Sequence, residues 1–210
     1  MPKLDYKKQL AHLYKPSPRE VVEVNVPEMS FLMIEGQGDP TTSESYSNAV
    51  EALYAVAYAL KFAIKKGPSA IDYGVMPLEA LWWADDMSAF VSGDRSAWQW
   101  TAMIMQPDPV TTELVETVLA DVSKKKNPPA LPLMRFATFE EGLAAQTMHV
   151  GPFSAEGPTI ERVHDFISAS GRTRFGKHHE IYLSDIRKAD PAKWQTVIRQ
   201  PMRSVPRDAA

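Results

Sequence analysis

Glu180 and Tyr182 are the first residues whose types and spacing could do chemistry. They lie in the stretch HHEIYLSD (residues 178–185), where Ile181 and Leu183 alternate with Glu180 and Tyr182. This period of two predicts a strand with one buried face, so the carboxylate and the phenol share the other face. A carboxylate between aromatic rings can attract a ligand cation or take a proton from water. The alternative is a solvated strand face, on which the pair has no function.

A pair of tryptophans, Trp82 and Trp83, provides aromatic surface for such a site. Adjacent strand residues point to opposite faces, and the parity with Leu81 predicts Trp83 in the core and Trp82 outward. Irregular backbone near Pro77 would reverse this assignment, so both are candidates for ligand binding. A tryptophan on an open sheet face favours a binding role. Weaker candidates, for each of which core packing is the alternative, are Tyr73, Trp100, Met103 and Phe153.

Other kinds of site find little support in the sequence. His178 and His179 are adjacent, so in a strand they point apart and cannot easily bind one metal ion. The chain has no cysteine, its serines lack a Gly-x-Ser-x-Gly context, and the glycines of EGQGDP (35–40) lack the phosphate-loop spacing. We therefore expect neither a metal nor a cofactor. Glu79, next to Pro77, can be a second acid of the pocket, but a charge that guards a sheet edge is the preferred interpretation.

The composition is that of an ordinary globular protein. Lys and Arg number 23 against 26 Asp and Glu, and a net charge of −3 gives no basic field for nucleic acid. No run of about 18 apolar residues suggests a membrane span, and the N-terminus lacks the apolar core of a signal peptide. These features predict a soluble, cytoplasmic protein, with a monomer as the default.

Strands and helices alternate along the chain in an order that occurs twice. Strands are expected at 21–26, 31–34, within YGVMPLEALWWADD (73–86) and at 98–105. Thr41 and Glu44 have capping-box spacing for a helix that Gly67 ends, and Asp108 with Pro109 predicts the start of another. After a linker at 127–132, strand material (136–148) is followed by a helix from Pro158 to Gly171 and by strands at 178–185 and 194–200.

Short sequence matches between the halves strengthen this repeat. MIEG (33–36) aligns with MHVG (148–151), LWWAD (81–85) with IYLSD (181–185), and WTAMIMQP (100–107) with WQTVIRQP (194–201). They predict an α+β domain of two strand–helix–strand–strand modules, which form one antiparallel sheet with helices on one face and a ligand groove on the other. We expect a single domain over 1–210, with modules at about 20–107 and 133–202 and a linking helix at 108–126. In this alignment Trp82 corresponds to Tyr182, and Ala80 to Glu180, so the groove carries one acid.

Together with VPEMSFLMIEGQGDP, VMPLEALWW, WQWTAMIMQPD and MHVGPFSAEGPTIERVHDFI, the stretch HHEIYLSD resembles the GyrI-like family of small-molecule-binding proteins, in its stand-alone bacterial branch. The resemblance runs from about Leu4 to Met202, with Ala80 where the family is expected to prefer glycine. It implies a groove for bulky hydrophobic, aromatic or cationic compounds, in which the glutamate of this strand, Glu180, contacts the ligand. Relatives include effector domains of multidrug-responsive regulators, but no segment here resembles a helix-turn-helix domain.

The resemblance also implies two possible activities. Some stand-alone members detoxify cyclopropane-bearing DNA-alkylating compounds by hydrolysis, so Glu180 is the expected base, with Tyr73 or Tyr182 stabilising the oxygen that becomes charged. Whether the chain only binds or also turns over its ligand stays open. The alternative from another class is a protein-interaction module of the DNA gyrase inhibitor type, which acts through an acidic surface.

Overall fold

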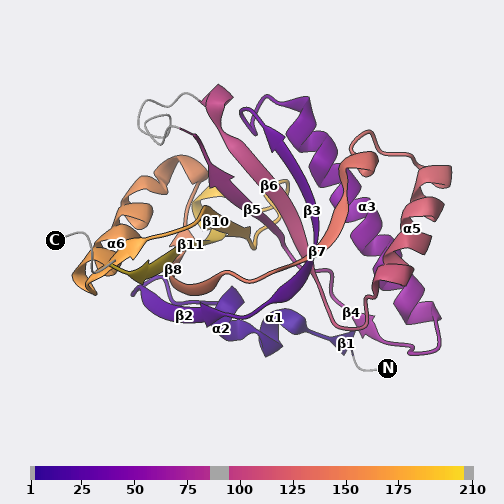
Figure 1. The fold of residues 1–210 in the computed structure, drawn as a ribbon, viewed down its shortest axis with the longest axis horizontal. Helices are drawn as coiled ribbons and strands as arrows, with labels where there is room; N and C mark the ends of the chain where they lie inside the picture. The colour runs from indigo at the N-terminus through magenta and orange to yellow at the C-terminus, as the bar shows by residue number, and fades with distance from the viewer. Residues whose placement is uncertain (1–2, 86–94, 206–210) are drawn as a thin grey trace. The chain divides into compact units, whose positions relative to one another are not determined.

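The computed structural model describes residues 3–85 and 95–205, which leaves Asp86, the end of one expected strand region, outside the described part (Figure 1). The chain divides into two compact units. The first comprises Met1–Gln9 and Met29–Phe139, and the second comprises Leu10–Glu28 and Glu140–Ala210. Both contain antiparallel sheet and helix, which confirms the expected α+β class. Among the described residues, none of the helices is both long and apolar enough to span a membrane.

The first unit is an antiparallel sheet with two long helices. Its strands follow the order β5 (Leu78–Trp83), β6 (Gln99–Gln106), β3 (Met29–Gln37) and β7 (Arg135–Phe139). The helix α3 (Glu44–Lys66) packs on β3 and β6, and α5 (Thr112–Lys125) lies beside α3 (Figure 1). Smaller elements are β1 (Lys3–Leu4), which pairs in parallel with β4 (Asp72–Tyr73), the short helix α1 (Tyr6–Gln9), and the 3-10 turns η1 (Arg95–Ala97) and η2 (Leu131–Leu133).

The starts of both long helices differ from the expectation. Ser43, not Thr41, is the N-cap of α3, because Thr41 instead binds Asp39: its N–H and its hydroxyl both donate to Asp39 Oδ1, at 2.8 and 2.7 Å. The N-cap of α5 is Thr111, whose hydroxyl accepts from the N–H of Leu114 at 3.3 Å. A side-chain-to-backbone bond therefore caps α5, whereas Ser43 makes no side-chain capping bond to α3. The end of α3 at Gly67 is as expected.

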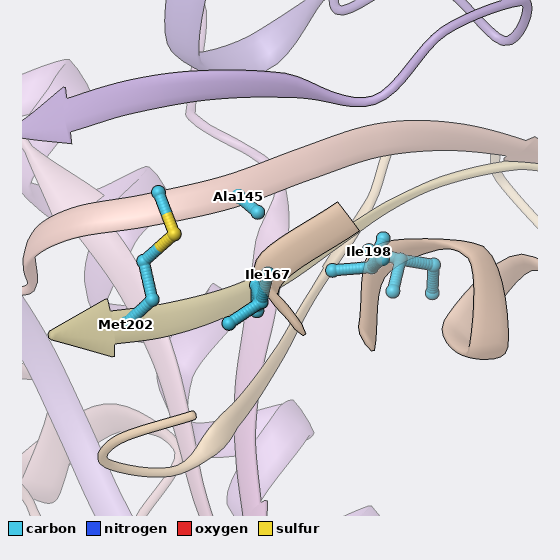
Figure 2. Packing of buried hydrophobic residues seen from close by; sticks show 5 residues of the cluster. Ala145, Ile167, Ile198 and Met202 are labelled. Carbon is cyan, nitrogen blue, oxygen red and sulfur yellow. The ribbon is translucent and has the colours of Figure 1, made fainter. Parts of the chain in front are cut away.

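The second unit is built on a comparable sheet. Its strands follow the order β2 (Val22–Val26), β8 (Gly142–Val150), β11 (Gln195–Ser204) and β10 (His178–Tyr182), while β9 (Arg172–Arg174) also pairs with β11. The helix α6 (Gly157–Ala169) follows the 3-10 turn η3 (Phe153–Ala155) and packs on β8 and β11. Figure 2 shows this core, where Ile167 of α6 lies near Ala145, Ile198 and Met202 of the strands. The single-turn helix α2 (Ala11–Tyr14) and the 3-10 turn η4 (Pro191–Lys193) complete the unit.

Each unit takes one edge strand from the other half of the sequence. The strand β2, expected in the first module, pairs with β8 of the second unit, and β7 pairs with β3 of the first unit. The central order of strand, helix, strand, strand is β3–α3–β5–β6 in the first unit and β8–α6–β10–β11 in the second. The duplicated modules are therefore present, and each is extended by a strand that the repeat did not reveal.

The strand registers test the three sequence matches. Met33 pairs with Met103 and the matching Met148 pairs with Val197, so MIEG/MHVG and WTAMIMQP/WQTVIRQP are structurally equivalent. The third match is wrong by two residues. Leu78 pairs with Ile104, and Glu180 pairs with Ile198, the counterpart of Ile104. Glu180 therefore corresponds to Leu78, and Tyr182 to Ala80, rather than Glu180 to Ala80 and Tyr182 to Trp82.

Candidate functional site

The carboxylate of Glu180 is held by its two neighbours on the same face of β10. The hydroxyl of Tyr182 donates to Oε2 of Glu180 at 2.8 Å, and Nε2 of His178 lies 3.1 Å from Oε1. Burial alternates along the strand, with Ile181 and His179 buried and the other three half-buried. The period of two seen in the sequence is therefore confirmed. About 15% of the Glu180 side chain is exposed, so the carboxylate lies at the border between solvent and protein.

This face of β10 is the one on which α6 packs. Cross-strand partners share a face, and Glu180 pairs with Ile198, which belongs to the core beneath α6. We expected Glu180 on the face away from the helices. That expectation is wrong for the second unit, because the opposite face is already covered. There Arg199 binds the backbone of Leu13 at 2.8 Å, and Gln146 binds that of His12 at 2.6 Å.

Two aromatic rings extend the site from Tyr182. The ring of Phe153 lies edge-on to Tyr182, with 5.6 Å between centroids, and 5.0 Å from the ring of Trp194. Phe153 keeps 38% of its surface exposed. Trp194 is fixed by a 3.0 Å bond from Nε1 to the carbonyl of Ala189. An exposed aromatic surface beside a half-buried carboxylate suits a flat apolar ligand with one polar or cationic group.

The turn that carries Phe153 is anchored by His149 of β8. Its Nδ1 lies 3.0 Å from the hydroxyl of Thr159 in α6, and its Nε2 lies 3.2 Å from the carbonyl of Pro152. His149 is 5% exposed, which makes it a structural link between strand, turn and helix. Phe153 is thereby held on a short, braced segment.

A second acid, Glu156, lies in the same neighbourhood at the start of α6. It is only 5% exposed, and burial together with the nearby charge of Glu180 raises the pKa of Glu156 to about 9. At neutral pH it is therefore a neutral carboxylic acid. The buried hydroxyl of Thr196, the cross-strand partner of Tyr182, lies close enough to Glu156 to oppose this rise in pKa slightly. Even so, neither Oε1 of Glu156 nor this hydroxyl makes a hydrogen bond of normal geometry within the described residues. Buried polar atoms of this kind are usually hydrogen-bonded to a water molecule or a ligand group.

Sequence reasoning missed Glu156, Trp194 and Thr196 as site residues. Trp194 had a signal, because it aligns with the candidate Trp100 in the repeat. Thr196 also had one, since it pairs directly with Tyr182 once the strands are in register. Glu156 had none. An acid near the start of a helix is common and usually solvated, and only its burial beside Glu180 distinguishes it.

The aromatic candidates of the first unit form a buried cluster. Trp82 is 5% exposed, and its ring lies 5.7 Å from Tyr46 of α3 and 5.8 Å from Trp98. Trp100 is fully buried, 5.0 Å from Tyr46. Trp83 is half-buried, so the expected burial of the two adjacent tryptophans is reversed. The reason is that the face of Trp82 is the one that α3 covers.

The remaining candidates of the first unit are in its interior. Met103 is fully buried between Met33 and Glu79 in the sheet register. Tyr73 is 1% exposed with its ring 6.1 Å from Tyr6, and burial raises its pKa well above the usual value. Glu79 is fully buried, so its interpretation as a charge at a solvated sheet edge is wrong. Across residues 3–85 and 95–205, no group of three or more His, Asp or Glu side chains is arranged to hold a metal ion.

Comparison with known proteins agrees with this architecture. The chain is 42% identical to an uncharacterized conserved protein from Listeria innocua, over 95% of this chain and 100% of that one, with a TM-score of 0.88. It is 40% identical to a protein described as a hydrolase from the same organism, again over 95% and 100%, with a TM-score of 0.83. The C-terminal domain of EcmrR, at 12% identity and a TM-score of 0.54 over 89% of this chain and 98% of that one, shares the fold.

No curated protein matches the chain. The sequence profile of the GyrI-like small molecule binding domain matches residues 19–203, which cover both units and the whole of the Glu180 site. With the duplicated modules and the similar structures, this match shows that the chain belongs to the GyrI-like family of small-molecule-binding domains.

Proposed function

We propose that this protein binds bulky hydrophobic or cationic small molecules at the Glu180 site and hydrolyses strained rings, such as the cyclopropanes of DNA-alkylating compounds. The observation that carries the proposal is the carboxylate of Glu180, fixed by Tyr182 and His178 next to the exposed ring of Phe153. The ring surfaces would hold a flat ligand, and the carboxylate would face its polar or reactive point. The 40% identical relative described as a hydrolase supports the enzymatic part.

The proposed reaction requires little machinery. Glu180 takes a proton from a water molecule, and the water oxygen bonds to a cyclopropane carbon. The carbon–carbon bond that breaks gives its electron pair to the conjugated system of the ligand, where an oxygen becomes negatively charged. The hydroxyl of Tyr182, which contacts Glu180 within the same unit, is one candidate to stabilise that oxygen, and Tyr73 is the other. Ring strain supplies part of the driving force.

The hydrolysis is tested with a cyclopropane-bearing alkylator and mass spectrometry. Wild-type protein should give the ring-opened, hydrated product. Glu180→Gln should lower turnover by about 10²–10⁴-fold, since general-base catalysis contributes that much. The control is Glu161→Gln, which removes an exposed carboxylate from α6 and should leave turnover unchanged. Equal turnover by wild type and Glu180→Gln would exclude Glu180 as the base.

Binding is measured separately by tryptophan fluorescence. Planar aromatic cations and hydrophobic dyes should quench Trp194, which stacks near Phe153, and Trp194→Phe should remove that part of the signal. The competing function is a protein-interaction module of the gyrase-inhibitor type. It predicts no quenching across a varied panel of compounds, together with inhibition of DNA supercoiling that survives Phe153→Ala.

A further inference from the structure

We propose that Glu156 is the proton donor of this site and works opposite Glu180, the proton acceptor. The inference rests on the proposed function and assigns the residue that protonates the ligand in the proposed hydrolysis. Hydrolytic ring opening consumes a proton at the oxygen that receives the electron pair, while another proton leaves the attacking water. Glu180 alone can accept the proton that leaves the water, but it cannot supply the proton that the ligand oxygen takes up.

The geometry around Glu156 supports this role. The residue is the N-cap of α6, directly after the turn that carries Phe153, and its N–H donates to the carbonyl of Phe153 at 3.1 Å. Its side chain lies close enough to Glu180 for the two carboxyl groups to interact. The two acids thus come from different elements, α6 and β10, and meet beside the same aromatic rings.

Two buried oxygen atoms mark where the proton would be delivered. Oε1 of Glu156 and Oγ1 of Thr196 are both buried, and neither makes a hydrogen bond of normal geometry among the residues described. A ligand oxygen, or one water that bridges to it, would satisfy both groups at once. A carboxylic acid and a hydroxyl can each donate a hydrogen bond, so together they can bind an acceptor oxygen, such as the carbonyl or phenolate oxygen of the conjugated ligand.

The proton balance of the step then closes. Water gives one proton to Glu180 and its hydroxyl to the ring carbon, while the carbon–carbon bond breaks and its electron pair moves to the ligand oxygen. That oxygen takes the proton of Glu156. After the step Glu180 is protonated and Glu156 ionised, and exchange with solvent restores both. Burial keeps the proton on Glu156, and the carboxylate of Glu180 is oriented by its contacts with Tyr182 and His178.

The protonation state of Glu156 depends on groups from several elements. Beside it are Glu180 of β10 and the uncharged Thr196 of β11. Tyr182 and His149 flank Thr196 in the strand register, and His178 contacts Glu180. On α6 itself the ionisable residues are Glu161, Arg162, His164 and Asp165. His164 is kept neutral because burial lowers its pKa to about 4. Of these, Arg162 is exposed and donates to the carbonyl of Pro18.

The first test measures the proton directly. In protein with ¹³C-labelled glutamate carboxyl groups, the NMR signal lost in Glu156→Gln should have the shift of a protonated acid at pH 7 and titrate near pH 9. If that variant does not fold, Glu156→Asp identifies the signal instead. A Glu156 that is ionised at pH 7 overturns the inference whether or not the protein is a hydrolase.

The second test measures turnover against pH. Glu156→Gln keeps the size of the neutral acid and a hydrogen-bond donor but has no proton to transfer. It should lower turnover about 10²-fold, leave quenching by a planar aromatic ligand within twofold, and abolish the fall of the rate at alkaline pH. Glu161→Gln should keep the wild-type profile. Wild-type turnover by Glu156→Gln would overturn the role of Glu156 alone, whereas no ring opening by wild type would overturn the proposed function.

Discussion

Gly36 and Gly151 are equivalent in the two modules, but each must be glycine for a different reason. An added Cβ at Gly36 would overlap the ring of Trp100, its cross-strand partner in β6. Gly151 has a φ of +140°, a conformation that residues with a side chain rarely adopt. The repeat MIEG/MHVG thus keeps one residue type for close packing in the first unit and for backbone conformation in the second.

Gly36→Ala should therefore destabilise the protein by about 1–3 kcal/mol, the usual cost of overpacking. Urea unfolding measures the change. Combination with Trp100→Leu, which removes the overlapping ring, should reduce the additional cost of the alanine to nearly zero. The same double substitution with Gly151→Ala should show no such rescue. If Trp100→Leu fails to rescue Gly36→Ala, the ring contact is not the reason for the glycine.

At the scale of elements, a buried ionic network holds the segment 10–15 on the second sheet. Arg199 of β11, 1% exposed, donates to Glu141 Oε2 at 3.0 Å, to Gln146 Oε1 at 2.9 Å and to the carbonyl of Leu13 at 2.8 Å. His179 lies 3.0 Å from Glu141 on the same face. A one-turn helix such as α2 has little stability of its own, so these bonds and its packing position it.

Arg199→Met should cost about 3–5 kcal/mol, because it leaves the carboxylate of Glu141 buried without its arginine partner. Hydrogen exchange should show lost protection at the amides of residues 13–15, which bond back to residues 10 and 11. Arg203→Met, in the same strand but exposed, is the control. A double change, Glu141→Leu with Arg199→Met, should recover part of the stability. Unchanged exchange in residues 13–15 would show that Arg199 does not hold this segment.

The elements also show which parts of the fold and of the site can be predicted from the sequence. Alternation in HHEIYLSD correctly placed Glu180 and Tyr182 on one face of β10, but alternation does not say which face the helix covers. A shift of two residues between β5 and β10 leaves every side chain on its face, so the repeat could not reveal it. The partners Glu141, His179 and Arg199 are 38 and 58 residues apart, and Glu156 stands out only through tertiary burial.

For the whole molecule, two buried acids affect the pH dependence of stability in opposite directions. Burial by itself would raise the pKa of Glu141, but the charges of His179 and Arg199 and their hydrogen bonds outweigh this desolvation and lower the pKa to about 2, from an ordinary 4.5. Its stabilising contribution is present above pH 4.5 and is lost as the pH falls towards 2. Glu156, whose pKa is raised to about 9, keeps its proton in the folded state while the unfolded chain releases it. Its cost to stability therefore grows from pH 4.5 up to about 9.

Glu156→Gln should accordingly raise the melting temperature, by more at pH 8 than at pH 5. The glutamine cannot ionise in the unfolded chain, so the pH-dependent cost disappears. Thermal unfolding of wild type and variant at the two pH values measures the effect, with Glu161→Gln as a variant expected to follow wild type. A melting temperature that falls equally at both pH values would mean that Glu156 is a stabilising residue. Stability given up at a residue of the proposed site is a common cost of function.

The two-residue offset between the strands β5 and β10 also decides how the duplicated halves should be engineered. A designer who follows the sequence match would transfer the acid to Ala80, which corresponds structurally to Tyr182. The homologous position is Leu78, the partner of Ile104 as Glu180 is of Ile198. Substituting glutamate at Leu78 and tyrosine at Ala80 would therefore reproduce in the first module the Glu180–Tyr182 pair of the second.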